Sequence, residues 1–210
     1  MKHIALLWIV ISCPFAAIAA DDWEEVSRAD DLVVFRKVMK DNPIFAYKGE
    51  ALVKAPFERV LSVVMNTERR TEWMERVVES STKKIISPYE KIDLMITRVP
   101  WPMRGREFLF RSIFQIDAKG KKATLRLESI EDPKFPQDPD RIRGWIQNAT
   151  FELIATSDYT TRVTAESHTD PKGWLPAWII NLVQRTFPRK TLGRLTEQAL
   201  KPDIESFKLR

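Results

Sequence analysis

Hydrophobic and polar residues alternate in short runs along the middle of the chain, between residues 32 and 168. Alternation with a period of two is typical of strands that bury one face. It is clearest where Phe108, Phe110 and Phe114 alternate with Arg111 and Gln115 of the opposite face. Turn-forming residues separate the runs at hairpin-like intervals, which predicts an antiparallel meander. The predicted strands span residues 32–39, 44–53, 77–86, 92–99, 107–116, 124–130, 142–154 and 161–168.

Two stretches change to a helical period. After Pro56, apolar residues between positions 60 and 65 recur at helical spacing and predict a short helix. After Gly173 a helical pattern continues almost to the end of the chain. Pro188 lies inside it, so we expect a bend or an interruption near residues 185–187. One face of this predicted helix carries Ile179, Leu182, Val183, Leu192, Leu195 and Ala199.

This order of elements predicts an α+β fold in which a curved antiparallel sheet wraps around a long C-terminal α-helix. The chain has 210 residues, which is enough for one domain with a sizeable core. We therefore expect residues 21–210 to form a single domain. A sheet that curves around one helix leaves room for an internal hydrophobic cavity, and ligand pockets are usually concave and largely apolar.

The first twenty residues have the pattern of a secretory signal peptide. Lys2 supplies a positive start, residues 4–11 are apolar, and small residues follow at positions 17, 19 and 20. We expect cleavage after Ala19 or Ala20, which would remove Cys13, the only cysteine. The competing interpretation is a lipoprotein signal in which Cys13 is acylated and kept. Either reading predicts export, to the periplasm in a bacterium and otherwise to a secreted or lumenal location.

Charge and composition exclude several classes of function. The net charge of +5 is a mild excess, and the chain has neither a basic–aromatic groove nor zinc-ligand spacing, so we expect no nucleic-acid partner. Only two histidines occur, and His3 lies in the predicted signal peptide. His168 alone is more typical of a structural residue than of a general base. We therefore expect no metal site, no cofactor and no enzymatic activity.

Three motifs together resemble one known family. Residues 172–176 read Lys-Gly-Trp-Leu-Pro and lead into the predicted C-terminal helix. Residues 106–108 read Arg-Glu-Phe after a Pro-Trp-Pro segment, and residues 71–73 read Thr-Glu-Trp. In this order they resemble the START family of lipid-binding domains, and the resemblance covers residues 30–201. Glu107 stands where the family usually has aspartate.

The resemblance implies a helix-grip fold whose interior holds one hydrophobic molecule, with the C-terminal helix as a lid. The cargo would be a phospholipid, a sterol-like molecule or a fatty-acyl lipid, which a monomer would carry between membranes or present. An alternative is a cyclase or aromatase of the same superfamily, acting on a polyketide-like substrate. An interior lined by converging ionisable groups would favour the enzyme, and a long apolar interior would favour the carrier.

Candidate cavity residues come from the inward faces of the predicted strands and of the last helix. In sterol-binding relatives a buried acidic residue and an arginine lie in the tunnel. Counting from Arg106 places Asp93 and Ser112 at those positions, so the arginine is missing, and Arg111 falls on the opposite strand face. Whether Asp93 or Ile92 faces inward stays open. The cavity candidates are Asp93, Met95, Thr97, Phe108, Phe110, Ser112, Phe114, Leu125, Leu127, Trp145, Gln147, Leu182, Leu192 and Leu195.

The C-terminal segment combines tryptophans with basic residues, a composition expected where a helix touches an anionic bilayer. The alternative is that the tryptophans pack in the core and the basic residues face solvent. Arg104 and Arg106 could bind a headgroup phosphate, but for Arg106 we favour a structural ion pair. The candidates for transient membrane contact are Trp174, Trp178, Arg185, Arg189 and Lys190.

Overall fold

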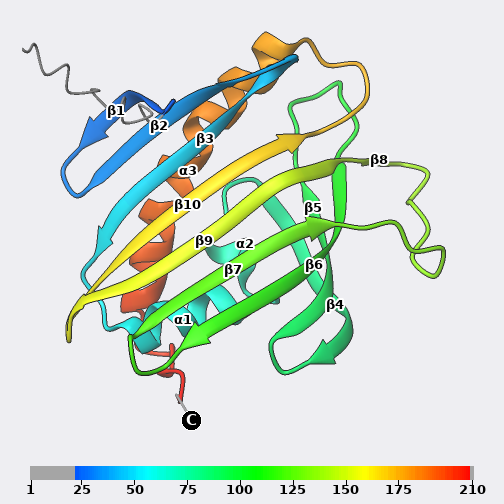
Figure 1. Cartoon of the computed structure of the whole chain (residues 1–210). Coiled ribbons are helices and arrows are strands. Elements are labelled where there is room, and N and C mark those ends of the chain that lie inside the picture. Colours follow the sequence, from blue (N-terminus) through cyan, green and yellow to red (C-terminus); the bar gives the residue numbers. More distant parts are fainter. Residues whose placement is uncertain (1–21, 209–210) are drawn as a thin grey trace, which may run out of the picture.

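The structure, a computed structural model, describes residues 22–208, so the predicted signal peptide and Cys13 lie outside the described residues. One antiparallel sheet curves around a long C-terminal helix (Figure 1), which confirms the predicted α+β fold. Its strands are β1 (Glu24–Ala29), β2 (Leu32–Met39), β3 (Asn42–Val53), β4 (Val77–Ser87), β5 (Glu90–Thr97), β6 (Arg106–Asp117), β7 (Lys122–Ser129), β8 (Ile142–Arg143), β9 (Trp145–Ser157) and β10 (Thr160–Asp170).

The strand order across the sheet is β1-β2-β3-β10-β9-β7-β6-β5-β4, and β8 pairs in parallel with β6 at one end. The pairing of β3 with β10 joins the N-terminal strands to the C-terminal ones. Strand β3 thereby lies in the part of the sheet that faces the last helix. All predicted strands are present, although residues 142–154 divide into β8 and β9. Strand β1 was not predicted, because its sequence, Glu-Glu-Val-Ser-Arg-Ala, lacks apolar alternation.

The helices are α1 (Phe57–Met65), α2 (Arg70–Trp73) and α3 (Ala177–Leu200). Pro56 is the N-cap of α1, as its fixed φ favours. Helix α3 runs through Pro188 as one continuous helix, so the interruption that we gave as one alternative is wrong, and the bend stays a prediction. The reason for the continuity is tertiary packing: α3 approaches β3 so closely that a Cβ on Gly49 would lie 2.8 Å from Pro188 Cβ and 2.7 Å from Leu192 Cδ1. The close packing of Gly49 on Pro188 and on Leu192, one turn later, holds this part of the helix against β3.

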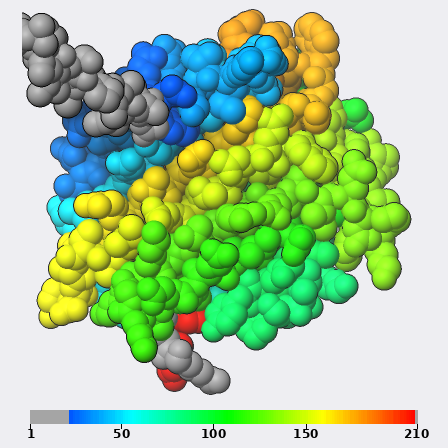
Figure 2. Space-filling view, in the orientation of Figure 1, coloured from blue at the N-terminus to red at the C-terminus, as the bar shows by residue number. Residues whose placement is uncertain are grey.

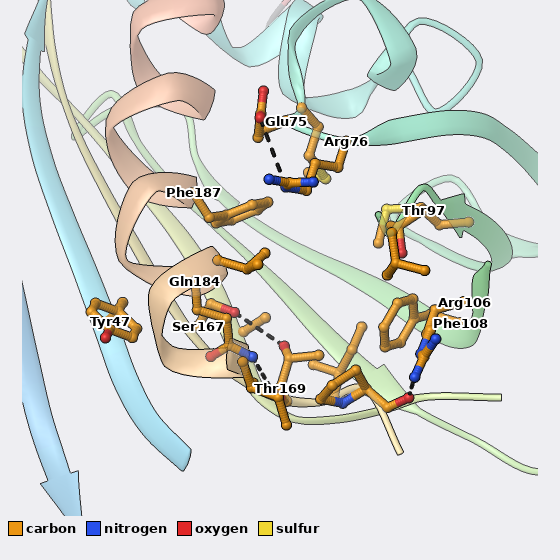
Figure 3. Close-up of a pocket in the computed structure, with 18 of the residues that line it drawn as sticks. Tyr47, Glu75, Arg76, Thr97, Arg106, Phe108, Ser167, Thr169, Gln184 and Phe187 are labelled. Carbon is orange, nitrogen blue, oxygen red and sulfur yellow. Dashed lines mark hydrogen bonds and ion pairs between the residues drawn. The ribbon is translucent and has the colours of Figure 1, made fainter. Parts of the chain in front are cut away.

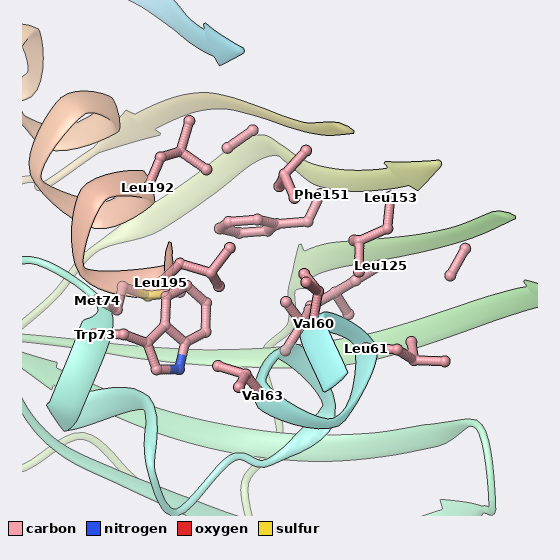
Figure 4. Close-up of a cluster of buried hydrophobic side chains, with 14 of the residues drawn as sticks. Val60, Leu61, Val63, Trp73, Met74, Leu125, Phe151, Leu153, Leu192 and Leu195 are labelled. Atoms are coloured by element: carbon pink, nitrogen blue, oxygen red, sulfur yellow. The ribbon is translucent and has the colours of Figure 1, made fainter. Parts of the chain in front are cut away.

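The core fills one half of the space between sheet and helices (Figure 4). Trp73 of α2 stands edge-on to Phe151 of β9, with ring centroids 5.7 Å apart and planes at 85°. Leu192 and Leu195, on the C-terminal half of α3, are fully buried against them. This half of the molecule is therefore closed by ordinary close packing, and any cavity lies towards the other half of α3.

The outer face of the sheet covers most of α3 when the molecule is seen from that side (Figure 2). The orange first turns of α3 and the loop before them emerge beyond the strands at one end. That loop contains Lys172 and Gly173, whose φ angles are 53° and 74°. Left-handed backbone at two successive residues turns the chain from β10 into α3, which places the first turns of the helix at the edge of the sheet.

Candidate functional site

A cavity of about 160 Å³ lies between the sheet and the N-terminal half of α3 (Figure 3). Hydrocarbon makes up most of its wall. Phe187 projects from α3 towards the opposite wall, where Phe108 and Thr97 stand on β6 and β5. The apolar lining residues are Met74, Met95, Val99, Pro100, Met103, Phe108, Leu127, Ile146, Ala149, Phe151, Ala165, Pro171, Leu175, Ile179, Ile180, Val183, Phe187 and Pro188.

Four of the predicted cavity residues line this pocket: Met95, Thr97, Phe108 and Leu127. The inward face of β5 is therefore the one that carries Asp93, Met95 and Thr97. A second group of candidates is buried in the core beside the pocket and does not line it. This group consists of Phe110, Phe114, Leu125, Leu192 and Leu195.

Three candidates lie away from the pocket, contrary to prediction. The register of β9 on β10 shifts between Asn148 and Ile146, which leaves Gln147 as an extra residue. Beyond this bulge Ile146 points inward, while Gln147 is exposed and Trp145 is absent from the pocket wall. Leu182 is 60% exposed. The inner face of α3 belongs instead to its neighbours on the helix, such as Val183 and Ile179.

The last two cavity candidates, Asp93 and Ser112, do not line the pocket and belong to a buried polar cluster centred on Asp93. Its Oδ2 accepts hydrogen bonds from Arg70 Nη1 at 2.9 Å, Ser112 Oγ at 2.6 Å and Thr67 Oγ1 at 3.1 Å. Its Oδ1 accepts one from Thr82 Oγ1 at 3.0 Å. Asp93 and Arg70 have no exposed side-chain surface. Burial lowers the pKa of Arg70 and the Asp93 charge opposes that shift.

Arg70 supplies the guanidinium group that the sequence count found missing at position 112. It comes from α2 rather than from β6, and its Nη2 donates to Ser112 Oγ at 3.2 Å. Its guanidinium also lies over the Phe110 ring, 5.4 Å from the centroid. Arg70 was not among the predicted site residues, because it stands in a polar stretch whose pattern is typical of a solvent-exposed helix. The indication in the sequence that this segment enters the core was Trp73, three residues later, whose large apolar side chain is expected to be buried.

Arg106 is buried but is not the ion pair that we favoured. Its guanidinium donates to three backbone carbonyls, those of Arg104, Pro171 and Lys172. No ion pair joins Arg106 to a carboxylate anywhere in residues 22–208, and burial lowers its pKa. Its role is to hold the turn that precedes α3. Arg104 donates to the Pro139 carbonyl at 3.0 Å.

A cluster of charged side chains, formed by Glu75, Lys190 and Arg194, lies at the α2 end of the pocket. Glu75 Oε1 is 3.2 Å from Lys190 Nζ, and Glu75 Oε2 is 2.9 Å from Arg194 Nη1. Both cations belong to α3, so Glu75 ties the middle of this helix to the segment after α2. Arg76, the next residue, lines the pocket. Sequence analysis did not single out either residue, because they follow α2 in a short connection without an apolar pattern.

The surface near the pocket exposes large aromatic side chains. Trp174 is 91% exposed and Trp178 68%, so neither packs in the core. Trp101, which was not predicted, is also 91% exposed and follows the lining residues Val99 and Pro100. The predicted basic residues Arg185, Arg189 and Lys190 are exposed on α3. Within residues 22–208, no helix is long and apolar enough to cross a membrane.

The remaining chemical candidates do not form a site. Among residues 22–208 there is no group of three or more histidine, cysteine, aspartate or glutamate side chains arranged to hold a metal ion. His168 is buried, its Nε2 lies 3.4 Å from Asn42 Nδ2, and burial lowers its pKa. It is not among the lining residues of the pocket. These placements leave the apolar cavity as the candidate site.

Comparison with known proteins identifies relatives over most of the chain. The family model for the START domain matches residues 16–189. An uncharacterized protein of Pseudomonas aeruginosa is 24% identical over 208 residues, which cover 96% of this chain and 100% of that protein. The phosphatidylcholine transfer protein of Rattus norvegicus is 22% identical over 168 residues, 79% of this chain and 78% of that protein.

Solved structures share the same fold. Human STARD10 superposes with a TM-score of 0.79 at 19% identity, covering 86% of this chain and 74% of that one. A STAR-related lipid transfer protein from Xanthomonas axonopodis superposes with a TM-score of 0.76 at 23% identity, covering 86% of this chain and 100% of that one. At these identities the likeness establishes the helix-grip architecture.

Proposed function

The chain belongs to the START domain family, whose named relatives include lipid-transfer proteins, and we propose that it binds one hydrophobic lipid between the sheet and α3 and carries or presents it. The observation that carries this proposal is the cavity itself, which lies next to the core yet remains open, with a wall that is mostly hydrocarbon. Moving an acyl chain from water into such a wall stabilises the complex by about 0.8 kcal/mol per methylene. The cargo is a phospholipid, a sterol-like molecule or a fatty-acyl lipid.

The cavity has to enlarge to take this cargo. Its volume of about 160 Å³ is below the roughly 300–1,000 Å³ that is typical of small-molecule sites. The C-terminal half of α3 is fixed in the core, and Arg59 donates to the Ala199 and Lys201 carbonyls at its end. The N-terminal half instead borders the cavity, with Asn181 and Gln184 as its hydrogen-bonded contacts to the sheet. We therefore assign the lid movement to the N-terminal half of α3.

The exposed tryptophans support a transient membrane contact during loading and release. Trp101 and Trp174 lie on two loops that contribute lining residues to the cavity, and Trp178 continues the surface onto α3. Indole rings favour the bilayer interface, and Arg185 and Arg189 add positive charge that attracts anionic lipids. A Trp101→Ala/Trp174→Ala variant should bind anionic vesicles more weakly in a sedimentation assay. Tyr159→Ala is the matched control, because Tyr159 is 77% exposed on the turn between β9 and β10. Equal losses in both variants would exclude the docking role.

The composition of the wall favours a carrier over the cyclase or aromatase alternative. The described lining residues include no histidine or cysteine, and the two lining glutamates already have partners. Glu75 binds Lys190 and Arg194, and Glu166 accepts a hydrogen bond from Asn148 Nδ2 at 2.9 Å. Acid–base chemistry on a bound substrate would need such groups free and facing it.

Native mass spectrometry of the purified protein tests the proposal. We expect a bound mass that organic extraction removes and that matches a lipid in the extract. A fluorescent fatty-acyl analogue should then bind to the extracted protein, and unlabelled lipid should displace it. Absence of any lipid from native preparations, together with no binding of the analogue, would end the carrier hypothesis.

We also propose that the chain acts outside the cytoplasm, in the periplasm if it comes from a bacterium. The proposal rests on the signal-peptide pattern of residues 1–20. Intact-mass analysis of the secreted form distinguishes the two readings. Cleavage after Ala19 or Ala20 gives an unmodified chain without cysteine, whereas a lipoprotein begins at an acylated Cys13.

A further inference from the structure

Arg76 lines the pocket and has a side-chain donor without a hydrogen-bond partner. Its Nε is buried and has no hydrogen-bond partner. The nearest carboxylate oxygen, Glu75 Oε1, is 3.9 Å away, and Glu75 already binds Lys190 and Arg194. A guanidinium N–H that is removed from water without an acceptor is energetically unfavourable. An oxygen supplied by the cargo would satisfy it.

The backbone directs Arg76 into the pocket. Its φ of 65° is left-handed, a conformation that non-glycine residues seldom adopt. The Arg76 carbonyl accepts a hydrogen bond of 2.9 Å from the Arg98 backbone, which fixes the segment at the end of the β4–β5 pair. Figure 3 shows the resulting side chain reaching towards Phe187 of α3. Strained residues of this kind are often found at ligand clamps.

Arg98 adds a second cation at the same end of the β4–β5 pair. It lines the pocket, and no ion pair or side-chain hydrogen bond engages it within the part of the chain that the structure describes. Glu75 is the carboxylate nearest to Arg76, and because it is shared with Lys190 and Arg194, the arginines at this end of the pocket keep an excess of positive charge. Guanidinium groups suit phosphate and carboxylate oxygens, to which they donate two parallel hydrogen bonds.

We infer that Arg76, supported by Arg98, binds the anionic group of the cargo, so that the protein selects amphiphiles whose headgroup carries a net negative charge. This inference rests on the proposed function. The apolar wall takes the acyl chain and is indifferent to the headgroup. Arg76 can bind the phosphate of either headgroup, but the choline ammonium of a zwitterionic lipid would lie near Arg76 and Arg98 and be repelled by them, which favours a net anionic lipid. A lipid phosphate and a fatty-acid carboxylate share the required chemistry.

Lipid uptake from mixed vesicles tests the inference. The full-length mature protein is incubated with vesicles that hold equal amounts of phosphatidylcholine and phosphatidylglycerol with matched acyl chains, then separated, and its lipids are counted by mass spectrometry. We expect phosphatidylglycerol to be enriched on the protein by about tenfold, which corresponds to about 1.4 kcal/mol of repulsion between the choline ammonium and the two arginines. Arg76→Gln should reduce the ratio towards that of the vesicles. A parallel arm with oleic acid in place of phosphatidylglycerol shows whether a carboxylate is also selected.

Arg162→Gln is the matched control, because Arg162 is exposed on β10 and does not line the pocket. It should keep the wild-type ratio, and circular dichroism checks that both variants are folded. Uptake of both phospholipids in proportion to supply, or an unchanged ratio in Arg76→Gln, would overturn the inference and leave the carrier function standing. Absence of all lipid uptake would instead overturn both.

Discussion

Replacing Asp93 with alanine should strongly destabilise the protein, because it leaves Arg70 buried without its counter-ion. Both side chains are fully buried, and Asp93 accepts four side-chain hydrogen bonds. Removing one partner of a buried ion pair typically costs about 3–5 kcal/mol of the free energy of unfolding. For a domain of this size, that corresponds to a fall in Tm of roughly 6–20 °C. Urea denaturation followed by circular dichroism measures the free energy, and a thermal scan measures Tm.

Glu90→Ala is the internal control, because Glu90 lies on the same strand and pairs with Arg111 of the neighbouring strand. The Arg111 side chain is 40% exposed, and an exposed pair contributes about 1 kcal/mol or less. An Arg70→Met/Asp93→Leu variant should recover part of the stability, because it removes both buried charges. If Asp93→Ala loses no more than Glu90→Ala, the cluster is not the electrostatic unit that its geometry indicates.

Three further predictions concern the attachment of α3. Gly49→Ala should lower the free energy of unfolding by about 1–3 kcal/mol in urea titrations, because its Cβ would overlap Pro188 and Leu192; Gly193→Ala, with nothing within 4 Å, should not. Pro188→Ala restores a helical hydrogen bond and should slow lipid exchange between vesicles, so an unchanged rate would contradict a flexible point there. Arg69, Gln198 and Lys201 hold the pKa of Glu72 at about 2, below its ordinary 4.5, so its stabilisation is complete above pH 4.5 and is lost as pH falls towards 2. Glu72→Gln should flatten the measured stability over that range, and a slope equal to the wild type would refute the assignment.

The strands were predictable because one face of the sheet is buried. From Phe110 to Phe114 of β6 the buried residues alternate with less buried ones, and a period of two leaves one consistent register, although Leu109 on the opposite face is fully buried. The long helix was predictable for the same reason, although Leu182 was placed on the wrong face. Local patterns of this kind determine which segments are strands and helices and leave the details of their contacts open.

The site was less predictable because its decisive features are not local. Gln147 was assigned inward by simple alternation, and only the pairing of β9 with β10 reveals the bulge that turns it outward. Arg70 is distant in sequence from Ser112, yet its guanidinium reaches the Ser112 hydroxyl. Arg76 has a left-handed backbone conformation, which the residue type does not predict, and this conformation directs its side chain into the pocket. Such features depend on which segments meet in the folded chain.

Pro188 packs closely on Gly49 near the middle of α3, so this contact is the point about which the helix can tilt. From Ala177 to Pro188 the helix extends over about 16 Å, so a tilt of about 20° displaces its first turn by roughly 6 Å. That exceeds the approximately 4 Å contact distance of hydrocarbon atoms and would admit an acyl chain. If the helix tilted as a rigid body, Leu195, about 10 Å beyond Pro188, would move by roughly 4 Å into a core without space. Because Pro188 lacks the backbone N–H of a regular helix, the N-terminal half of α3 can tilt while the C-terminal half stays packed in the core.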